Sequence, residues 1–166
     1  MKEKYLNTLL LYYEEEIMGE GYFLSLSKHF TEKHQKEKMV MMAEVERYAA
    51  KSVMPLLQKY KLQPRPAKIL HTIGEEGVKK IVNLSWIEFI QQINDNYPNY
   101  LIEFAALEAL APSEDLPLLK ILTNHEFAAI EFAELELAGV NLSIKPLLEY
   151  MKKSLDFVLK MKVMGI

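Results

Sequence analysis

The sequence predicts an all-α protein, a four-helix bundle with one long crossover connection and an additional C-terminal helix. Two observations predict this fold. The chain has only six glycines and contains no Asn-Gly or Gly-Gly pair, so the usual signals of β-hairpins are missing. Its apolar residues recur instead at three- and four-residue spacing, as on the buried face of a helix. Because half of the 166 residues are hydrophobic, we expect residues 1–166 to form a single domain with one substantial core.

The first two helices are predicted on either side of a turn at Thr31. The first helix is expected to run from about Lys4 to Phe30, and its apolar stripe includes Glu20. Thr31 is a preferred N-cap residue and is expected to start the second helix, whose apolar face includes Glu46. Pro55 lacks an amide donor and is expected to kink or interrupt this helix one turn before its end.

The crossover is predicted between residues 63 and 83. Gln-Pro-Arg-Pro at 63–66 forms a stiff connector, and a less regular helix over 67–83 follows. Ser85-Trp86-Ile87-Glu88 matches a capping box, so another helix is expected to start at Ser85 and continue to Ala111.

The second helix pair is predicted around a tight turn at Ser113, which is a preferred N-cap residue like Thr31. A helix from Glu114 is expected to end at Gly139, because glycine suits the left-handed stop position. A final amphipathic helix is expected to start near Ser143 and to pack against the bundle.

Four glutamates interrupt the apolar faces of these helices at nearly matching distances from the two turns. They are Glu20, Glu46, Glu103 and Glu126. In bundles with this connectivity, a di-iron or di-manganese site takes one Glu from each of two helices and a Glu-x-x-His motif from each of the other two. The sequence therefore predicts these four glutamates as metal ligands. Both positions expected to hold the histidines carry alanine, Ala49 and Ala129, so the motif is incomplete.

Three segments carry a family resemblance: EIMGE at 16–20, AEVERYA at 43–49 and HEFAAIEFAELELAG at 125–139. With them the chain resembles the ferritin-like superfamily, and within it the rubrerythrin-like proteins. The resemblance implies a di-iron carboxylate site with the same four glutamates as ligands, and oxidase, peroxidase, hydroxylase or iron-storage chemistry. The chain has no cysteine, so it lacks the thiolates that the additional iron centre of rubrerythrins requires.

The missing histidines leave several interpretations of the site open. The glutamates are either buried and protonated without metal, or ligands of an oxygen-loving ion, or surface groups. His125 is predicted on a helix face outside the core, because it lies about 100° around the helix from Glu126. We expect a degenerate or lost di-metal site in a module that binds a small molecule or a protein. The alternative is a di-iron or di-manganese oxidase or hydroxylase, so iron, manganese and a metal-free state all stay open.

Composition excludes several other classes of function. Without cysteine there is no disulfide, thiolate site or cysteine nucleophile. The net charge of −3 provides no basic footprint for nucleic acid. The N-terminal apolar run ends in three glutamates instead of a cleavage site, and no apolar stretch approaches the roughly 20 residues that span a bilayer. We therefore expect a cytoplasmic protein without membrane contact, and its apolar helices suggest a homodimer.

Overall fold

The computed structural model describes residues 2–164, apart from the side chains of residues 158, 161, 162 and 164. Within this range the chain is all-α and contains no strand, which confirms the predicted class. The helices are α1 (Lys2–His29), α2 (Lys33–Lys59), α3 (Ala67–Gly77), a 3-10 helix η1 (Val78–Lys80), α4 (Trp86–Leu110), α5 (Leu116–Leu137) and α6 (Lys145–Met164).

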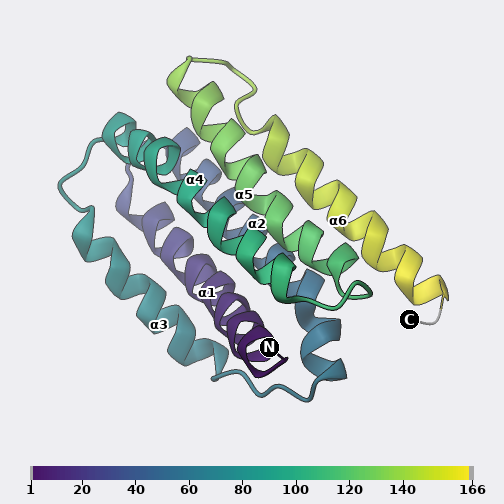
Figure 1. The fold of residues 1–166 in the computed structure, drawn as a ribbon. Helices are drawn as coiled ribbons and strands as arrows, with labels where there is room; N and C mark the ends of the chain where they lie inside the picture. Colours follow the sequence, from purple (N-terminus) through teal and green to yellow (C-terminus); the bar gives the residue numbers. More distant parts are fainter. Residues whose placement is uncertain (1, 165–166) are drawn as a thin grey trace.

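Helices α1, α2, α4 and α5 form a bundle of two hairpins, with α3 on one side and α6 on the other (Figure 1). Helix α1 pairs with α2, α4 pairs with α5, and the two hairpins meet mainly where α2 packs against α5. Helix α6 lies against both α5 and α2. In contrast, α1 and α4 touch each other only sparsely, so the bundle is most open between these two helices.

The crossover runs along the outer side of α1 and returns the chain to the start of α4 (Figure 1). Glycine allows this close approach. A Cβ atom on Gly74 would lie 1.9 Å from the backbone oxygen of Met18, and a Cβ atom on Gly21 would lie 2.7 Å from the backbone of His71. Helix α3 is therefore held against α1 by backbone contact, and the predicted crossover helix is present at 67–77, continued by η1.

The apolar interior is divided into two cores along the bundle axis. The first core lies toward the end that carries Phe30 and Trp86, and the second lies toward the end that carries Tyr5 and Leu57. Helices α1, α2, α4 and α5 contribute to both. Residues at the middle of these helices therefore separate one apolar cluster from the other.

The buried carboxylate of Asp115 joins α1 and the end of α2 to the start of α5, beside the second core. Asp115 accepts hydrogen bonds from the Tyr5 hydroxyl at 2.7 Å, the Tyr60 hydroxyl at 2.7 Å and Lys59 Nζ at 2.6 Å. Burial alone would raise the pKa of Asp115, but these three donors outweigh it and hold the pKa below its usual value. A similar arrangement lies beside the first core, where Glu136 accepts hydrogen bonds from Lys38 Nζ at 2.6 Å and from the Trp86 indole at 2.9 Å.

The predicted helix ends are confirmed at two positions. Ser85 and Glu88 form the reciprocal hydrogen bonds of a capping box, at 2.8 and 3.3 Å. Gly139 has a φ of 71°, which is the left-handed conformation expected after a helix. At Pro55 the helix is not interrupted, because α2 continues through it to Lys59.

The two predicted N-caps are wrong. Helix α2 begins at Lys33, two residues beyond Thr31. Its N-cap residue is Glu32, whose side chain makes no capping hydrogen bond. Helix α5 begins at Leu116 after Asp115, three residues beyond Ser113. The Asp115 carboxylate does not cap its own helix, since tertiary hydrogen bonds already engage it.

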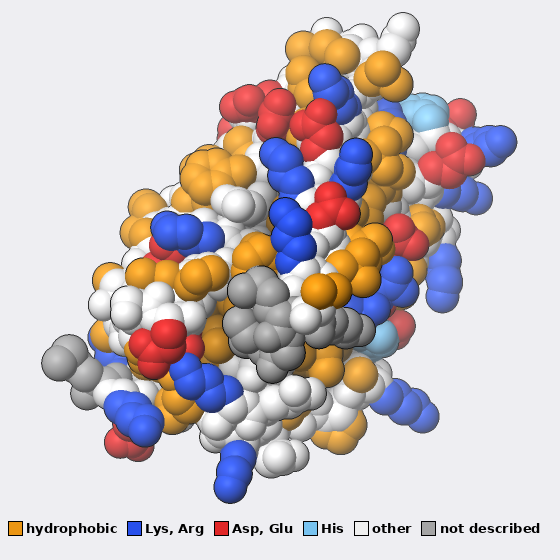
Figure 2. Space-filling model, turned by 90° about the vertical axis from the view of Figure 1, so that its right-hand side faces the viewer, with side chains coloured by type: hydrophobic (Ala, Val, Ile, Leu, Met, Phe, Trp, Pro, Cys, Tyr) orange, Lys and Arg blue, Asp and Glu red, His pale blue; other side chains and the backbone are white. Residues whose placement is uncertain are grey.

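The face that carries α6 shows hydrophobic side chains interspersed with basic and acidic ones (Figure 2). On this helix Leu148 and Leu155 are each 47% exposed. Among the described helices, none combines the length and apolar character that crossing a bilayer requires.

Candidate metal centre and its pocket

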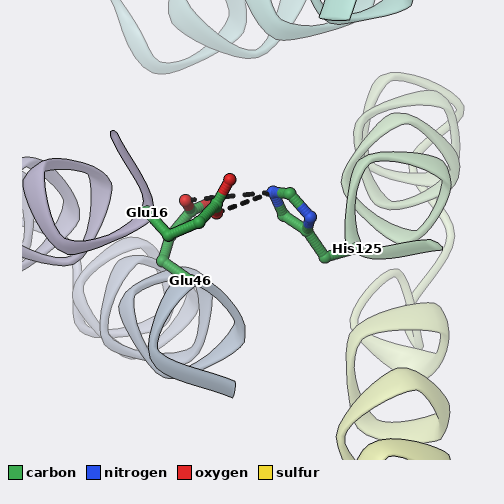
Figure 3. Close-up of side chains that lie close together, drawn as sticks. All are labelled: Glu16, Glu46 and His125. Atoms are coloured by element: carbon green, nitrogen blue, oxygen red, sulfur yellow. Dashed lines mark ion pairs between the residues drawn. The ribbon is translucent and has the colours of Figure 1, made fainter. Parts of the chain in front are cut away.

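Four buried polar side chains converge at the middle of the bundle, between the two apolar cores. Glu16 comes from α1, Glu46 from α2, and His125 and Glu126 from α5. Their exposed fractions are 3%, 7%, 1% and 6% in that order. Figure 3 shows Glu16 and Glu46 on adjacent helices, both pointing across the bundle toward the imidazole of His125.

The imidazole Nε2 atom of His125 is the centre of this cluster. It lies 3.0 Å from Glu16 Oε2, 3.2 Å from Glu126 Oε1 and 4.0 Å from Glu46 Oε2. One ligand atom from each of Glu16, Glu46 and His125 lies within 4.8 Å of the other two. No hydrogen-bond partner among the described residues satisfies His125 Nε2, Glu16 Oε2 or Glu126 Oε2, although all three atoms are buried. Buried polar atoms are rarely left unsatisfied, so this convergence needs a proton or a cation.

The other ring nitrogen fixes the orientation of His125. Its Nδ1 atom contacts the carbonyl oxygen of Leu122, one turn earlier on α5. A carbonyl oxygen can only accept, so Nδ1 carries the hydrogen. The lone pair of a neutral imidazole then lies on Nε2, toward the carboxylates, which is how a histidine is commonly prepared to ligate a metal.

Two of the buried carboxylates, those of Glu46 and Glu126, resist ionisation in the absence of a cation. Burial and the charge of Glu16 raise the pKa of Glu46 well above its usual value, although His125 opposes the rise. Burial also raises the pKa of Glu126, again against the influence of His125. For His125 itself burial favours the neutral ring, but the charges of Glu16 and Glu126 outweigh burial and raise its pKa. A positive charge at this point would therefore stabilise the ionised form of the carboxylates and reduce the repulsion between them.

Space for the Glu46 carboxylate comes from a glycine on the neighbouring helix. A Cβ atom on Gly19 would lie 2.5 Å from Glu46 Oε2 and 3.0 Å from its Cδ. Any larger residue at this position would have to displace the carboxylate. Gly19 therefore forms one wall of the space that holds the Glu46 side chain.

A cavity of about 450 Å³ lies between α1, α3 and α4 and reaches Glu16, Glu46 and Glu126. It occupies the open side of the bundle, where α1 and α4 barely touch. Its size is within the range of small-molecule sites. The walls combine carboxylates, amides and aromatic rings: Tyr12, Glu15, Tyr22, Phe23, Phe89, Gln92, Asn96, Tyr97, Tyr100, Glu103 and Phe104. A small molecule in this cavity would lie next to the buried carboxylates.

The structure separates the four predicted ligands into two groups. Glu46 and Glu126 both lie in the buried cluster. Glu20 is half-buried and pairs with His71 of α3, at 3.3 Å between Glu20 Oε2 and the imidazole Nε2. Glu103 is exposed on the wall of the cavity.

Two members of the cluster, Glu16 and His125, were not among the predicted ligands. Glu16 precedes Glu20 by one helical turn and so shares its face, and this spacing was the available signal. His125 was predicted to lie outside the core, and this prediction is wrong because the residue is 1% exposed. Helix α6 covers this side of α5, and the ring of Tyr150 lies 6.3 Å from the imidazole. With α6 on one side and α1 and α2 on the other, adjacent positions of α5 are both buried.

No family model, curated protein or solved structure matches this chain.

Proposed function

We propose that this protein is a ferritin-like bundle that binds a transition-metal ion, iron or manganese, through Glu16, Glu46, Glu126 and His125. A small molecule that enters the cavity between α1 and α4 would reach the ion. The observation that carries the proposal is the buried, unpartnered Nε2 atom of His125, which faces three carboxylates while Nδ1 is fixed by a carbonyl.

The separations of the polar atoms support one ion. Ligands bound at about 2.1 Å lie about 3.0 Å apart at right angles and about 4.2 Å apart when opposite. The distances from His125 Nε2 to the three carboxylates, 3.0, 3.2 and 4.0 Å, are within this range. Carboxylate oxygens together with one imidazole suit iron and manganese, and a bound ion would supply Lewis-acid or redox chemistry.

The protein groups have separate tasks in this proposal. Leu122 holds the His125 ring through Nδ1, and Gly19 leaves room for the Glu46 carboxylate. The raised pKa values of Glu46 and Glu126 mean that binding an ion displaces protons, so affinity rises with pH. The cavity brings the other reactant to the buried centre.

Anaerobic titration of the metal-free protein with Fe²⁺, Mn²⁺ and Co²⁺ tests the proposal. We expect one ion per chain, and stabilisation by about 2.7 kcal/mol when the free ion is at 100 times its dissociation constant. Glu16→Gln is expected to weaken binding at least about tenfold, whereas Glu20→Gln, one turn away on the same helix, is the matched control. Equal loss in both variants, or none in either, would contradict this ligand set.

A second candidate is a metal-free binding module, and the raised pKa of His125 favours it. In that case a protonated imidazole supplies the positive charge between Glu16 and Glu126. The module would show no uptake of the three ions, and nitrogen NMR would show a protonated His125 ring at neutral pH. Uptake of one ion together with deprotonation of Nε2 would exclude it.

A further inference from the structure

The outer part of the cavity carries two matching pairs of side chains on facing helices. Tyr12 and Glu15 lie three residues apart on α1, and Tyr100 and Glu103 lie three residues apart on α4. Residues at this spacing share a helix face, and all four side chains line the same cavity. The rings of Tyr12 and Phe104 meet edge to face at 5.0 Å, which ties this part of α1 to α4.

The ionisable side chains that line the cavity give it an acidic character. Five glutamates line it, and no lysine or arginine does so in the described part of the chain. Glu15 and Glu103 form no ion pair with any described residue, whereas Glu14 on the same helix is paired with Arg65 at 2.7 Å. With all five carboxylates ionised, a divalent ion bound at the centre would leave the lining with a formal charge of −3. The acidic lining therefore favours cations over anions.

The remaining walls suit an organic cation better than a hydrated inorganic one. Tyr12, Tyr22, Tyr97 and Tyr100 border the cavity, and the Tyr97 and Tyr100 rings are 5.4 Å apart. Aromatic faces attract ammonium groups through the ring quadrupole. Deeper in the cavity, Phe89 and Ile93 form an apolar wall that would desolvate a hydrocarbon chain but offers nothing to an ion with its water shell.

Two buried atoms also indicate a ligand. Glu16 Oε2 and Glu126 Oε2 have no hydrogen-bond partner among the described residues, and both side chains line the inner end of the cavity. The negative field of the outer pairs therefore continues to the buried centre. A cationic ligand is attracted along the whole length of the cavity.

We propose that this cavity binds a small organic amine in its ammonium form. The ammonium group lies between Glu15 and Glu103 near the rings of Tyr12 and Tyr100, and the hydrocarbon part follows the apolar wall inward. The inference rests on the proposed function in treating the cavity as the substrate site of the metal centre. The residues that select the amine are separate from those that hold the ion.

Three probes of equal length test the selection: hexylammonium, hexan-1-ol and hexanoate, measured by isothermal titration calorimetry at low ionic strength. Hexylammonium is expected to bind at least about tenfold tighter than hexan-1-ol, since a hydrogen bond between charged groups contributes more than a neutral one. Hexanoate is expected not to bind. Equal affinity for ammonium and alcohol, or tighter binding of the carboxylate, would overturn the inference.

A pair of double variants assigns the effect to the cavity. Glu15→Gln with Glu103→Gln should reduce hexylammonium affinity at least about tenfold and leave hexan-1-ol unchanged. Glu44→Gln with Glu75→Gln removes the same charge from exposed positions outside the cavity and is the control. An equal loss in both double variants would show a general charge effect and overturn the inference.

Metal titration of the same proteins keeps the two proposals apart. The Glu15 and Glu103 double variant is expected to retain one ion per chain, because neither residue belongs to the proposed ligand set. Ammonium selection without metal uptake would remove the proposed function and leave this inference. Metal uptake without ammonium selection would overturn this inference and leave the proposed function.

Discussion

Substitution of Gly19 by alanine separates the stability of the bundle from its ability to hold an ion. The added Cβ atom would lie 2.5 Å from Glu46 Oε2, whereas ordinary contact begins at 3.4 Å. The carboxylate must therefore move by about 0.9 Å. A metal site tolerates ligand displacements of only about 0.2 Å, so Glu46 would be lost as a ligand.

The two measured quantities should change in opposite directions. Alanine in a helix is about 0.5–1 kcal/mol better than glycine, and the displaced atom is the mobile end of a side chain, so the metal-free variant should be as stable or more stable. Its dissociation constant for Co²⁺ or Mn²⁺ should rise about 10- to 100-fold. Urea unfolding of the metal-free protein and anaerobic titration measure the two effects.

Gly77→Ala is the matched control for this experiment. Gly77 lies in α3 and, like Gly19 in α1, borders the cavity, but its Cβ atom would meet only the Tyr22 ring, at 3.3 Å. Metal affinity should stay close to that of the parent protein. If Gly19→Ala bound metal as tightly as Gly77→Ala, the Glu46 carboxylate would not be a ligand and the argument from its confined space would be refuted.

Two further predictions concern the fold. Gly74→Ala places a Cβ atom 1.9 Å from the Met18 backbone oxygen, which cannot move aside, so we expect a loss of more than about 2 kcal/mol in urea unfolding; an unchanged midpoint would contradict the close packing of α3 on α1. Because the pKa of Asp115 is lower in the folded protein than in the unfolded chain, its contribution is complete above the unfolded value and is lost as pH falls through the folded value. Asp115→Asn should therefore cost about 2–4 kcal/mol at pH 7 and less below about pH 4, and a difference independent of pH would contradict the role of its charge.

The sequence was sufficient to predict the helices and their order, because helix formation depends on local spacing. The capping box at Ser85 and the left-handed Gly139 are decided within a few residues, and both are confirmed. The N-caps at Thr31 and Ser113 were wrong, since a turn between packed helices depends on tertiary contacts. At the second turn Asp115, the residue before α5, accepts hydrogen bonds from Tyr5 of α1 and Lys59 of α2, which local sequence does not show.

The centre was only half predictable, because a helical sequence does not reveal which face meets which neighbour. Three consecutive glutamates in α1 have three different surroundings: Glu14 binds Arg65, Glu15 lines the cavity and Glu16 faces His125. In the sequence this run looks like a solvated surface. The dimer and the cytoplasmic location stay predictions.

The division of the interior into two apolar cores shows where this protein forgoes stability. Replacing buried charged groups with well-packed apolar residues of similar volume is often neutral or stabilising by about 1–4 kcal/mol. Replacing Glu16, Glu46, His125 and Glu126 with apolar residues would join the two cores and could therefore make the bundle more stable. The protein instead keeps a layer of polar side chains between the two cores, next to the sparse contact between α1 and α4. Tolerance to mutation should differ accordingly. Either core should accept the exchange of one apolar residue for another, whereas substitutions in the polar layer between the cores should be the first to abolish function.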